Sequence, residues 1–399
     1  MNIRKISLLK LFIVFTIVLT GCWDAKIINE MYYVVSIGID YSFEEEEYIC
    51  FTQYVDFASV MSAEGKPAEE LPPYIGIGKG KTVNAALNNI YDEAQHRVFW
   101  GHVKAIVYSE NALRNGLDET FDALNRFPEF RYTPWVYGAT GSIMDLFNVT
   151  SIFKLSVIHT ILHNPTYRYE QRSILPPLRF NEFIRMYDDP SVSVVLSNLE
   201  MSKETFFEGK ESKEKMRLNG AFILEDNEYK GLVNQEHLMG YRWVQEKTFR
   251  TPVILEKDGK QLGVVSLINP DIKINYENAN GQVFFDLKVN FEANAVDLTT
   301  PITESEILKI AEDKMEKEIR DTYLHGVGMK ADIYSLGETV YRKDIELWKQ
   351  LTKDGPFQLQ AENLRNIDVN VSLVNTGKYK LKDRRIYNEE LEKRVFYEE

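Results

Sequence analysis

The sequence predicts an α+β protein of two to three domains, in which mixed β-sheets are flanked by helices. The chain has 399 residues, and at roughly 100 to 200 residues per domain this length gives two or three domains. Apolar residues make up 44% of the chain and aromatic residues 12%, far from the composition of disordered chains. Helical and strand patterns alternate through the first half, and strands dominate the second half. These observations together define the fold class.

The first half opens with a predicted hairpin of two strands around an acidic turn, because both segments are rich in β-branched and aromatic residues. A glycine-rich turn then leads into a helix with apolar residues at helical spacing. A strand, a second amphipathic helix that ends before Pro128, and another strand follow. The predicted elements are, in order, 31–40, 48–55, 82–96, 98–108, 113–124 and 134–139.

The second half follows a charged stretch that is poor in apolar residues. Its clearest local signals are the Asn280-Gly281 dipeptide, which predicts a hairpin turn, and Thr303 with Glu306, which predict a capping box at the start of a long helix. The predicted elements are strands 218–224, 229–234, 253–256, 262–268, 272–276, 283–291 and 367–374, with a helix after residue 303 and another over 338–351.

These shifts in composition predict a division of the chain. The predicted parts are a lipoprotein signal peptide (1–21), an N-terminal α+β domain (22–200), a linker (201–217), a strand-rich middle domain (218–270), a C-terminal α+β domain (271–385) and a charged tail (386–399).

The first 22 residues are typical of a secretory signal. Three basic residues precede a short apolar run over residues 11–19, and a run of this length is well below the ~20 apolar residues of a permanent membrane span. Leu19-Thr20-Gly21-Cys22 follows directly and looks like a bacterial lipobox. We therefore expect cleavage before Cys22 and lipidation of this cysteine.

Lipid on Cys22 would have to anchor the chain without help from its charge. The whole chain carries 47 basic and 60 acidic residues, and the part after residue 21 carries 44 and 60, a net charge of -16. Such a body is repelled by anionic lipid and by nucleic acid, whereas two acyl chains suffice for stable anchoring. Trp23 and Asp24 would lie near the membrane, where the indole can sit at the headgroups or act only as part of the tether.

Other candidate chemistry is weak. The Gly76–Thr82 segment resembles a phosphate loop, but only three residues lie between Gly76 and Gly80. A phosphate loop has four residues between the corresponding glycines. His159 and His163 would share one helical face, but no third ligand accompanies them. No G-x-S-x-G elbow occurs, and Cys50, the other cysteine, is typical of a buried strand residue. We therefore expect no catalytic residues, no metal and no cofactor.

Several motifs in order resemble the Ger(x)C family, the lipoprotein C subunits of spore germinant receptors. The chain has Cys22-Trp23-Asp24 followed by Gly38-Ile39-Asp40, similar to the family's N-terminal signature. Further similar motifs are Gly80-Lys81-Thr82, Trp100-Gly101-His102-Val103-Lys104, Asn219-Gly220-Ala221-Phe222 with Gly231-Leu232, and Asp332-Ile333 with Gly337 and Trp348. Residues 236–240 follow the family pattern only loosely, and residues 382–399 do not align with it.

The resemblance implies a non-catalytic, lipid-anchored subunit on the outer face of the spore inner membrane, required for nutrient-triggered germination. It implies two partners, the A and B membrane subunits of the receptor, and an α+β body of three domains. The alternative interpretation is a lipid-anchored extracellular solute-binding protein, which predicts a deep apolar pocket with a few converging polar groups. Neither interpretation involves nucleic acid.

Overall fold

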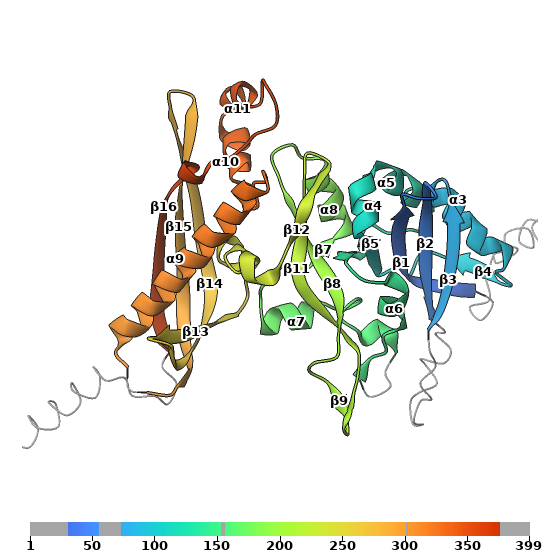
Figure 1. Ribbon diagram of the computed structural model, residues 1–399, viewed down its shortest axis with the longest axis horizontal. Coiled ribbons are helices and arrows are strands. Elements are labelled where there is room, and N and C mark those ends of the chain that lie inside the picture. The colour runs from blue at the N-terminus through green and yellow to red at the C-terminus, as the bar shows by residue number, and fades with distance from the viewer. Residues whose placement is uncertain (1–30, 56–72, 153–155, 301, 376–399) are drawn as a thin grey trace, which may run out of the picture.

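The protein folds around two mixed β-sheets, a large one from the first part of the chain and a smaller one from the second (Figure 1). The computed structural model describes residues 31–55, 73–152, 156–300 and 302–375. The α+β class predicted from the sequence is confirmed, because both sheets combine parallel and antiparallel strands and both carry helices. The predicted signal peptide and charged tail lie outside the described residues.

The large sheet has ten strands, eight of them in the order β12-β11-β8-β6-β5-β1-β2-β3. Strands β1, β5, β6 and β8 run parallel, and antiparallel strands complete both edges. The strands are β1 Met31–Ser42, β2 Glu47–Val55, β3 Tyr74–Gly80, β4 Arg97–Phe99, β5 Ala105–Ser109, β6 Trp135–Ala139, β7 Leu178–Arg179, β8 Val194–Ser202, β11 Lys215–Glu225 and β12 Glu228–Val233. The predicted hairpin at the start of the chain is confirmed by the antiparallel pairing of β1 with β2.

Helices of this first part begin shortly after strands, at residues suited to helix N-termini. Thr82, Ser109 and Ser142 each accept a hydrogen bond from a backbone N–H three residues later, which satisfies one of the free amides of the first turn. The helices are α3 Val83–Asn89, α4 Glu110–Asn115, α5 Asp118–Leu124, α6 Ile143–Asn148, α7 Thr166–Gln171 and α8 Phe180–Tyr187, with short 3₁₀ turns η2 Ile90–Asp92 and η4 Val157–His159.

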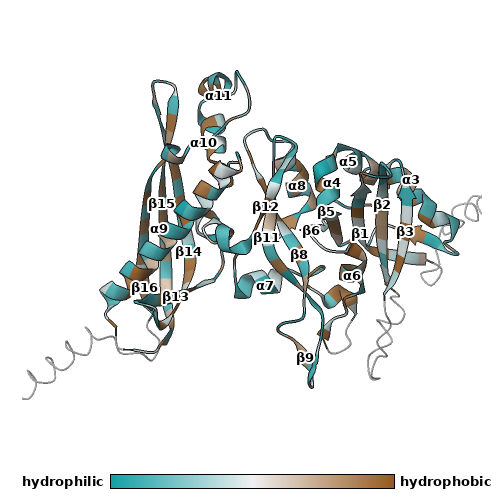
Figure 2. Cartoon of the chain, in the orientation of Figure 1, coloured by the Kyte–Doolittle hydropathy of each residue, from teal (hydrophilic) through white to brown (hydrophobic). Residues whose placement is uncertain are grey.

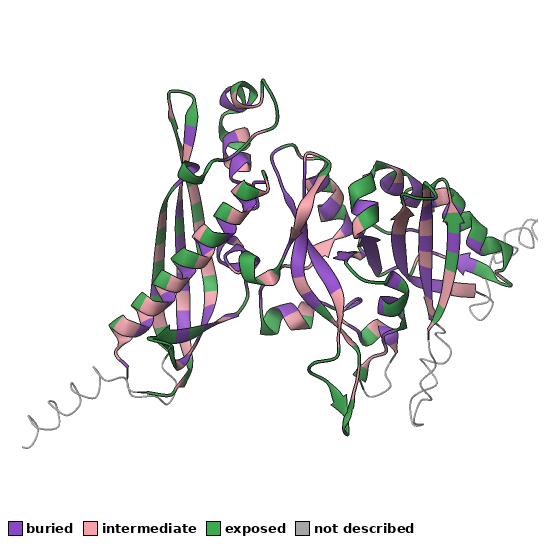
Figure 3. Cartoon of the chain, viewed as in Figure 1, coloured by how far each residue is buried: buried purple, intermediate pink, exposed green. Residues whose placement is uncertain are grey.

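The large sheet buries both faces, as its parallel centre requires. Along β5, Ile106 and Tyr108 face a core formed with α3, α4, α5 and α8, whereas Ala105 and Val107 face a second core formed with α6. Figure 3 shows the resulting burial of the central strands.

The smaller sheet has the order β13-β14-β15-β16, with β15 and β16 parallel and the other pairs antiparallel. Its elements are β13 Thr251–Lys257, β14 Lys260–Ala279, β15 Gln282–Leu298, α9 Glu304–Gly328, α10 Leu336–Lys343, α11 Ile345–Leu351 and β16 Leu364–Asn375, with 3₁₀ turns η5 Gln235–Leu238, η6 Tyr241–Val244 and η7 Ala361–Asn363. Helix α9 lies across this sheet (Figure 1) and buries one apolar stripe, visible as alternating colours in Figure 2.

The two parts share one apolar core. Val195 of β8 and Ala221 and Ile223 of β11 belong to the same buried cluster as the residues of α9 and the smaller sheet. The neighbouring residues of β11, Phe222 and Leu224, face the core of the large sheet instead. Strand β11 therefore holds the two parts together, because its two faces are buried in different cores.

The structure differs from the predicted division at residues 201–217 and 218–270. The charged stretch contains a hairpin, β9 Phe207–Glu208 with β10 Glu211–Ser212, and the first residues of β11. It resembled a linker because this hairpin is exposed and needs few apolar residues. Strands β11 and β12 join the large sheet, and β14 crosses the predicted boundary at residue 270 without interruption.

Three shorter elements also differ from the sequence prediction. The strand expected over 98–108 is two strands, β4 and β5. The helix expected over 113–124 is two helices separated at Gly116, whose φ of 96° is unfavourable for other residues. The helix expected over 338–351 is divided into α10 and α11 near Asp344.

Candidate functional site

The residues that the sequence identifies for lipid attachment and membrane proximity, Cys22, Trp23 and Asp24, lie outside the described residues. The described chain begins at Met31, the first residue of β1. Within the described part of the chain, no helix is long and apolar enough to cross a membrane.

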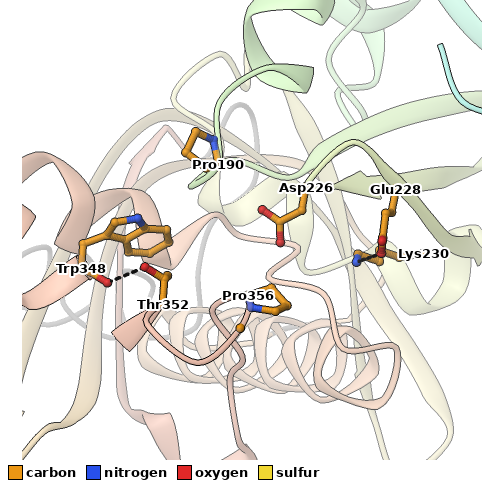
Figure 4. Close-up of a pocket in the computed structure, with 8 residues that line it drawn as sticks. Pro190, Asp226, Glu228, Lys230, Trp348, Thr352 and Pro356 are labelled. Carbon is orange, nitrogen blue, oxygen red and sulfur yellow. Dashed lines mark hydrogen bonds and ion pairs between the residues drawn. The ribbon is translucent and has the colours of Figure 1, made fainter. Parts of the chain in front are cut away.

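A groove of about 400 Å³ lies where the first part of the chain meets the second (Figure 4). The turn between β11 and β12 forms one wall with Asp226, Glu228 and Lys230, and Lys230 Nζ lies 2.8 Å from Glu228 Oε2. The other wall comes from α11 and the loop after it and includes Trp348 and Thr352. Figure 4 shows Asp226 between two proline rings, those of residues 190 and 356.

The groove has a mixed lining, in which apolar surface exceeds polar surface. Its apolar surface includes one indole and two proline rings, and its polar groups include two carboxylates on one wall. The solute-binding alternative predicts a deep apolar pocket with converging polar groups, whereas this groove is open and its two carboxylates lie on the same wall.

Two buried carboxyl groups lie next to the groove. Glu225, the last residue of β11, is 9% exposed, and Asp332, between α9 and α10, is 5% exposed. The Asp332 backbone N–H donates to Glu225 Oε2 at 3.1 Å, and Gly337 N–H donates to Asp332 Oδ2 at 2.7 Å. Asp332 Oδ1 has no hydrogen-bond partner among the described residues. The junction therefore contains a carboxyl group from each part of the chain.

Burial changes the acidity of both groups. It raises the pKa of Glu225 to about 8, with a further contribution from the negative charge of Asp332. It raises the pKa of Asp332 to about 6, against the opposing effect of backbone N–H donors from Gly337 and its neighbours. At neutral pH, Glu225 is therefore mostly protonated and Asp332 mostly ionised.

Further polar contacts cross the same junction. Arg342 of α10 forms an ion pair with Asp189 at 2.6 Å, and Ser193 N–H donates to Ser335 Oγ at 3.1 Å. These contacts fix the orientation of the two parts, because hydrogen bonds and ion pairs are directional while the apolar core beneath them is not.

The other residues that the sequence singled out have structural roles. The Gly76–Thr82 segment is the end of β3 and the N-cap of α3. Cys50 is fully buried, and burial raises the pKa of its thiol, which makes it a poor nucleophile. His159 and His163 lie in and just after a 3₁₀ turn instead of on one helical face. No group of three metal-ligating side chains occurs among the described residues.

His163 contacts a serine in an arrangement that sequence analysis missed. Its Nε2 lies 2.8 Å from Ser36 Oγ, and its Nδ1 lies 2.9 Å from the carbonyl oxygen of Val157. Ser36 is fully buried, and its hydroxyl also donates to Gln53 Oε1 at 2.8 Å. A hydroxyl held inside the core in this way cannot reach a substrate, so the pair stabilises the fold.

The buried carboxyl pair was also missed. Asp332 was named in the sequence only as part of a family-like motif with Gly337 and Trp348, without a role, and Glu225 was not named among the 60 acidic residues. Their burial follows from a contact between residues 107 positions apart. The local signal at Glu225 is the apolar run before it, which predicts a buried strand reaching that residue.

The described residues form two joined α+β parts with a groove where the parts meet. Two family models match the two parts: the spore germination protein N-terminal domain over residues 24–201, and the spore germination B3/GerAC-like C-terminal domain over residues 219–377. The chain belongs to this family of spore germination proteins, the Ger(x)C family.

Relatives from Bacillus subtilis (strain 168) match over most of their length. Spore germination protein KC is 24% identical over 88% of this chain and 90% of its own length, and spore germination protein B3 is 20% identical over 90% and 95%. The crystal structure of the GerBC protein matches with a TM-score of 0.53 and 17% identity, over 85% of this chain and 97% of that one. This structural match supports the same fold.

Proposed function

We propose that this protein is a lipid-anchored, non-catalytic subunit of a nutrient germinant receptor, and that it is required to trigger spore germination. The observation that carries the proposal is the match of both parts of the chain to spore germination domains, in order, behind a lipobox. Spore germination proteins KC and B3, two relatives named for this process, match the chain over nearly their whole length. A shared role in germination follows from this family membership.

The anchoring part of the proposal places a diacylglyceryl group on Cys22, at the outer face of the spore inner membrane. Two acyl chains are about what stable anchoring requires, and the net charge of -16 after residue 21 gives the body no attraction to anionic lipid. The proposed partners are the A and B membrane subunits of the receptor. The groove beside Asp226 and Trp348 offers them a surface that spans both parts of the chain.

The experiment that tests the anchor is the Cys22→Ala substitution, followed by fractionation of spore membranes and a germination assay. We expect the protein to leave the membrane fraction and germination to be reduced. Cys50→Ala is the matched control, since it removes the other cysteine from a fully buried position and leaves the anchor intact. Unchanged membrane association of the Cys22→Ala protein would contradict the proposal.

The receptor part is tested by crosslinking intact spore inner membrane and isolating this protein with its neighbours. We expect the A and B subunits to be recovered with it. A protein that is anchored but recovered without either subunit would contradict receptor membership and would leave the anchor itself supported. Saturable binding of an amino acid or sugar to the body alone would favour the solute-binding alternative.

A further inference from the structure

A second cavity, of about 320 Å³, lies at the edge of the large sheet where β5 and β6 begin. Lys104 immediately precedes β5, and the N–H of Trp135, the first residue of β6, donates to its carbonyl oxygen at 2.8 Å. The short strand β7 pairs with the start of β6 and brings Arg179 to the same place. His163 and Asn164, between η4 and α7, and Thr166, the first residue of α7, complete the cavity.

The charged residues that line this cavity are all basic. They are Lys104, Arg131 and Arg179, and none of the described residues that line it is acidic; His102 and His163 also line it, with a lowered pKa. The chain as a whole has a net charge of -13, so a concave surface without a carboxylate is unusual for it. Positive charges that line a cavity focus their field there and attract anions.

Lys104, Arg131 and Arg179 have no carboxylate partner among the described residues. Among the described residues, no ion pair involves Lys104, Arg131 or Arg179. The carboxylate that acts on Arg179 is that of Glu182, which is bound to Lys247 at 2.8 Å. Two arginines outside the cavity are each paired with two carboxylates: Arg217 contacts Glu200 and Glu204, and Arg365 contacts Glu277 and Asp286.

Positive charges at the cavity lower the pKa of both histidines that line it, in addition to the effect of burial. The pKa of His102 is lowered first by burial and then by the charges of Arg131 and Lys104. The pKa of His163 is lowered to about 4, mainly by burial, and Lys104 contributes to this shift as well. Like charges that lie this close raise the free energy of the empty cavity, and a bound anion would offset that cost.

The geometry leaves hydrogen-bond donors available to an anion. The Arg179 guanidinium lies over the Trp135 ring, 3.2 Å from its centroid, and donates to the carbonyl oxygen of Thr133. This stacking fixes the plane of the guanidinium, which has five N–H donors in all. Lys104 and Arg131 are exposed at the cavity surface, and Asn164 adds a side-chain amide.

We propose that this cavity, with Lys104, Arg131 and Arg179 as its cationic ligands, binds a phosphate-type oxyanion. Arginine and lysine together are well suited to phosphate, which accepts several charge-assisted hydrogen bonds at once. The anion can come from a soluble phosphate ester or from the headgroup of a phospholipid.

Binding of a phospholipid headgroup depends on the proposed lipid anchor, which would bring the cavity to the membrane. Binding of a soluble phosphate ester does not depend on the anchor. The rings of His102 and Tyr33 are 5.3 Å apart, centre to centre, so the cavity lies close to the start of β1. Cys22 and Tyr33 are eleven positions apart, and at roughly 3.6 Å per position this distance is at most about 40 Å. An anchored Cys22 would thus keep this cavity within reach of the headgroups.

The test uses the full mature chain, residues 22–399, with Cys22→Ser so that the acyl chains do not dominate binding. The pocket variant is Lys104→Gln with Arg131→Gln. The matched control is Lys260→Gln with Lys353→Gln, which changes the net charge equally at exposed positions outside the cavity. Circular dichroism and thermal unfolding establish that all three proteins fold.

Inorganic phosphate and glycerol 3-phosphate are titrated calorimetrically into each protein. We expect saturable binding to the parent and the control, and binding at least about tenfold weaker to the pocket variant, since two charged donors are lost. This result supports a site for a soluble phosphate ester.

Vesicle flotation tests whether the bound anion is the headgroup of a phospholipid and not a soluble phosphate ester. If the ligand is a phospholipid, the parent and the control float with vesicles that contain phosphatidylglycerol, and the pocket variant does not. The proposal is overturned if neither phosphate nor these vesicles bind, or if the pocket and control variants lose binding equally. Either negative result leaves the germination role untouched, because that role is tested at Cys22 and by crosslinking.

Discussion

The Glu225→Gln substitution should stabilise the protein increasingly as the pH rises. The Glu225 carboxyl group is buried at the junction of the two parts, and burial raises its pKa to about 8 from an ordinary value of 4.5. The unfolded chain ionises this group above pH 4.5, but the folded chain resists ionisation until about pH 8. The contribution of Glu225 to the free energy of unfolding is therefore fully present below pH 4.5 and is lost as the pH rises toward 8.

The size of the effect follows from the difference in pKa. Each unit of difference corresponds to about 1.4 kcal/mol, so the parent loses about 2 kcal/mol by pH 6 and about 5 kcal/mol above pH 8. Glutamine is neutral at every pH, and its Oε1 can still accept the Asp332 N–H that Glu225 accepts at 3.1 Å. The variant should therefore match the parent near pH 4 and exceed it at pH 8.

The assay is urea unfolding of both proteins from pH 4 to pH 9, with the difference in free energy of unfolding plotted against pH. Glu228→Gln is the matched control, since this exposed residue has a lowered pKa through its contact with Lys230, and it should show no such gain. Glu225→Leu separates charge from hydrogen bonding: it is also neutral, but it leaves the Asp332 N–H without its acceptor, at a cost of about 1–3 kcal/mol. A Glu225→Gln protein whose advantage does not grow with pH would refute the reasoning.

Two further predictions concern α9. Glu318→Ala should cost about 3–5 kcal/mol in urea unfolding, because it removes the acceptor for Arg242 Nη2 at 2.9 Å and for Trp243 Nε1 at 2.7 Å and leaves a guanidinium buried without its carboxylate. The double variant with Arg242→Met should recover part of this loss, and a double variant less stable than Glu318→Ala alone would contradict the explanation. Thr303→Ala should cost about 1 kcal/mol by thermal unfolding, since its side chain caps α9 through the Glu306 N–H at 3.2 Å; a stability equal to the parent's would show that the cap contributes nothing.

Local turn and cap chemistry made parts of the fold predictable from the sequence. Asn280 and Gly281 have φ values of 55° and 84° at the tip of the β14–β15 hairpin, the conformation that this dipeptide favours. The capping box of Thr303 and Glu306 is present as predicted. Both features depend on residues within four positions of one another, so no tertiary contact is needed to identify them.

Other elements depend on contacts between distant residues and could not be predicted. Strand β11 pairs with β8, and its alternate residues enter two different cores, but its sequence alone predicts only a buried strand. Strand β14 continues through Asn269, whose φ is 53°, with a register shift between Ile268 and Asp271. The sequence suggested two separate strands there, because Pro270 normally interrupts a ladder.

The groove and the basic cavity were less predictable than the fold for the same reason, because each is lined by separate segments of the chain. Lys104, Arg131 and Arg179 come from three separate segments, and no short motif links them. Lys104 appeared in the sequence only as part of a family-like strand motif. Its charge contributes to the cavity because β5 and β6 are parallel, which places the starts of both strands at the same end of the sheet.

The shared core makes the two parts of the chain move together. Opening a hinge between them would expose Val195, Ala221 and Ile223 together with their neighbours in the smaller sheet, and fully exposing one valine or isoleucine side chain costs about 1.5–3 kcal/mol. The contact between Arg342 and Asp189 would be lost as well. A ligand at the basic cavity or a partner at the groove would therefore displace the two parts as one body, because a hinge motion exposes this core.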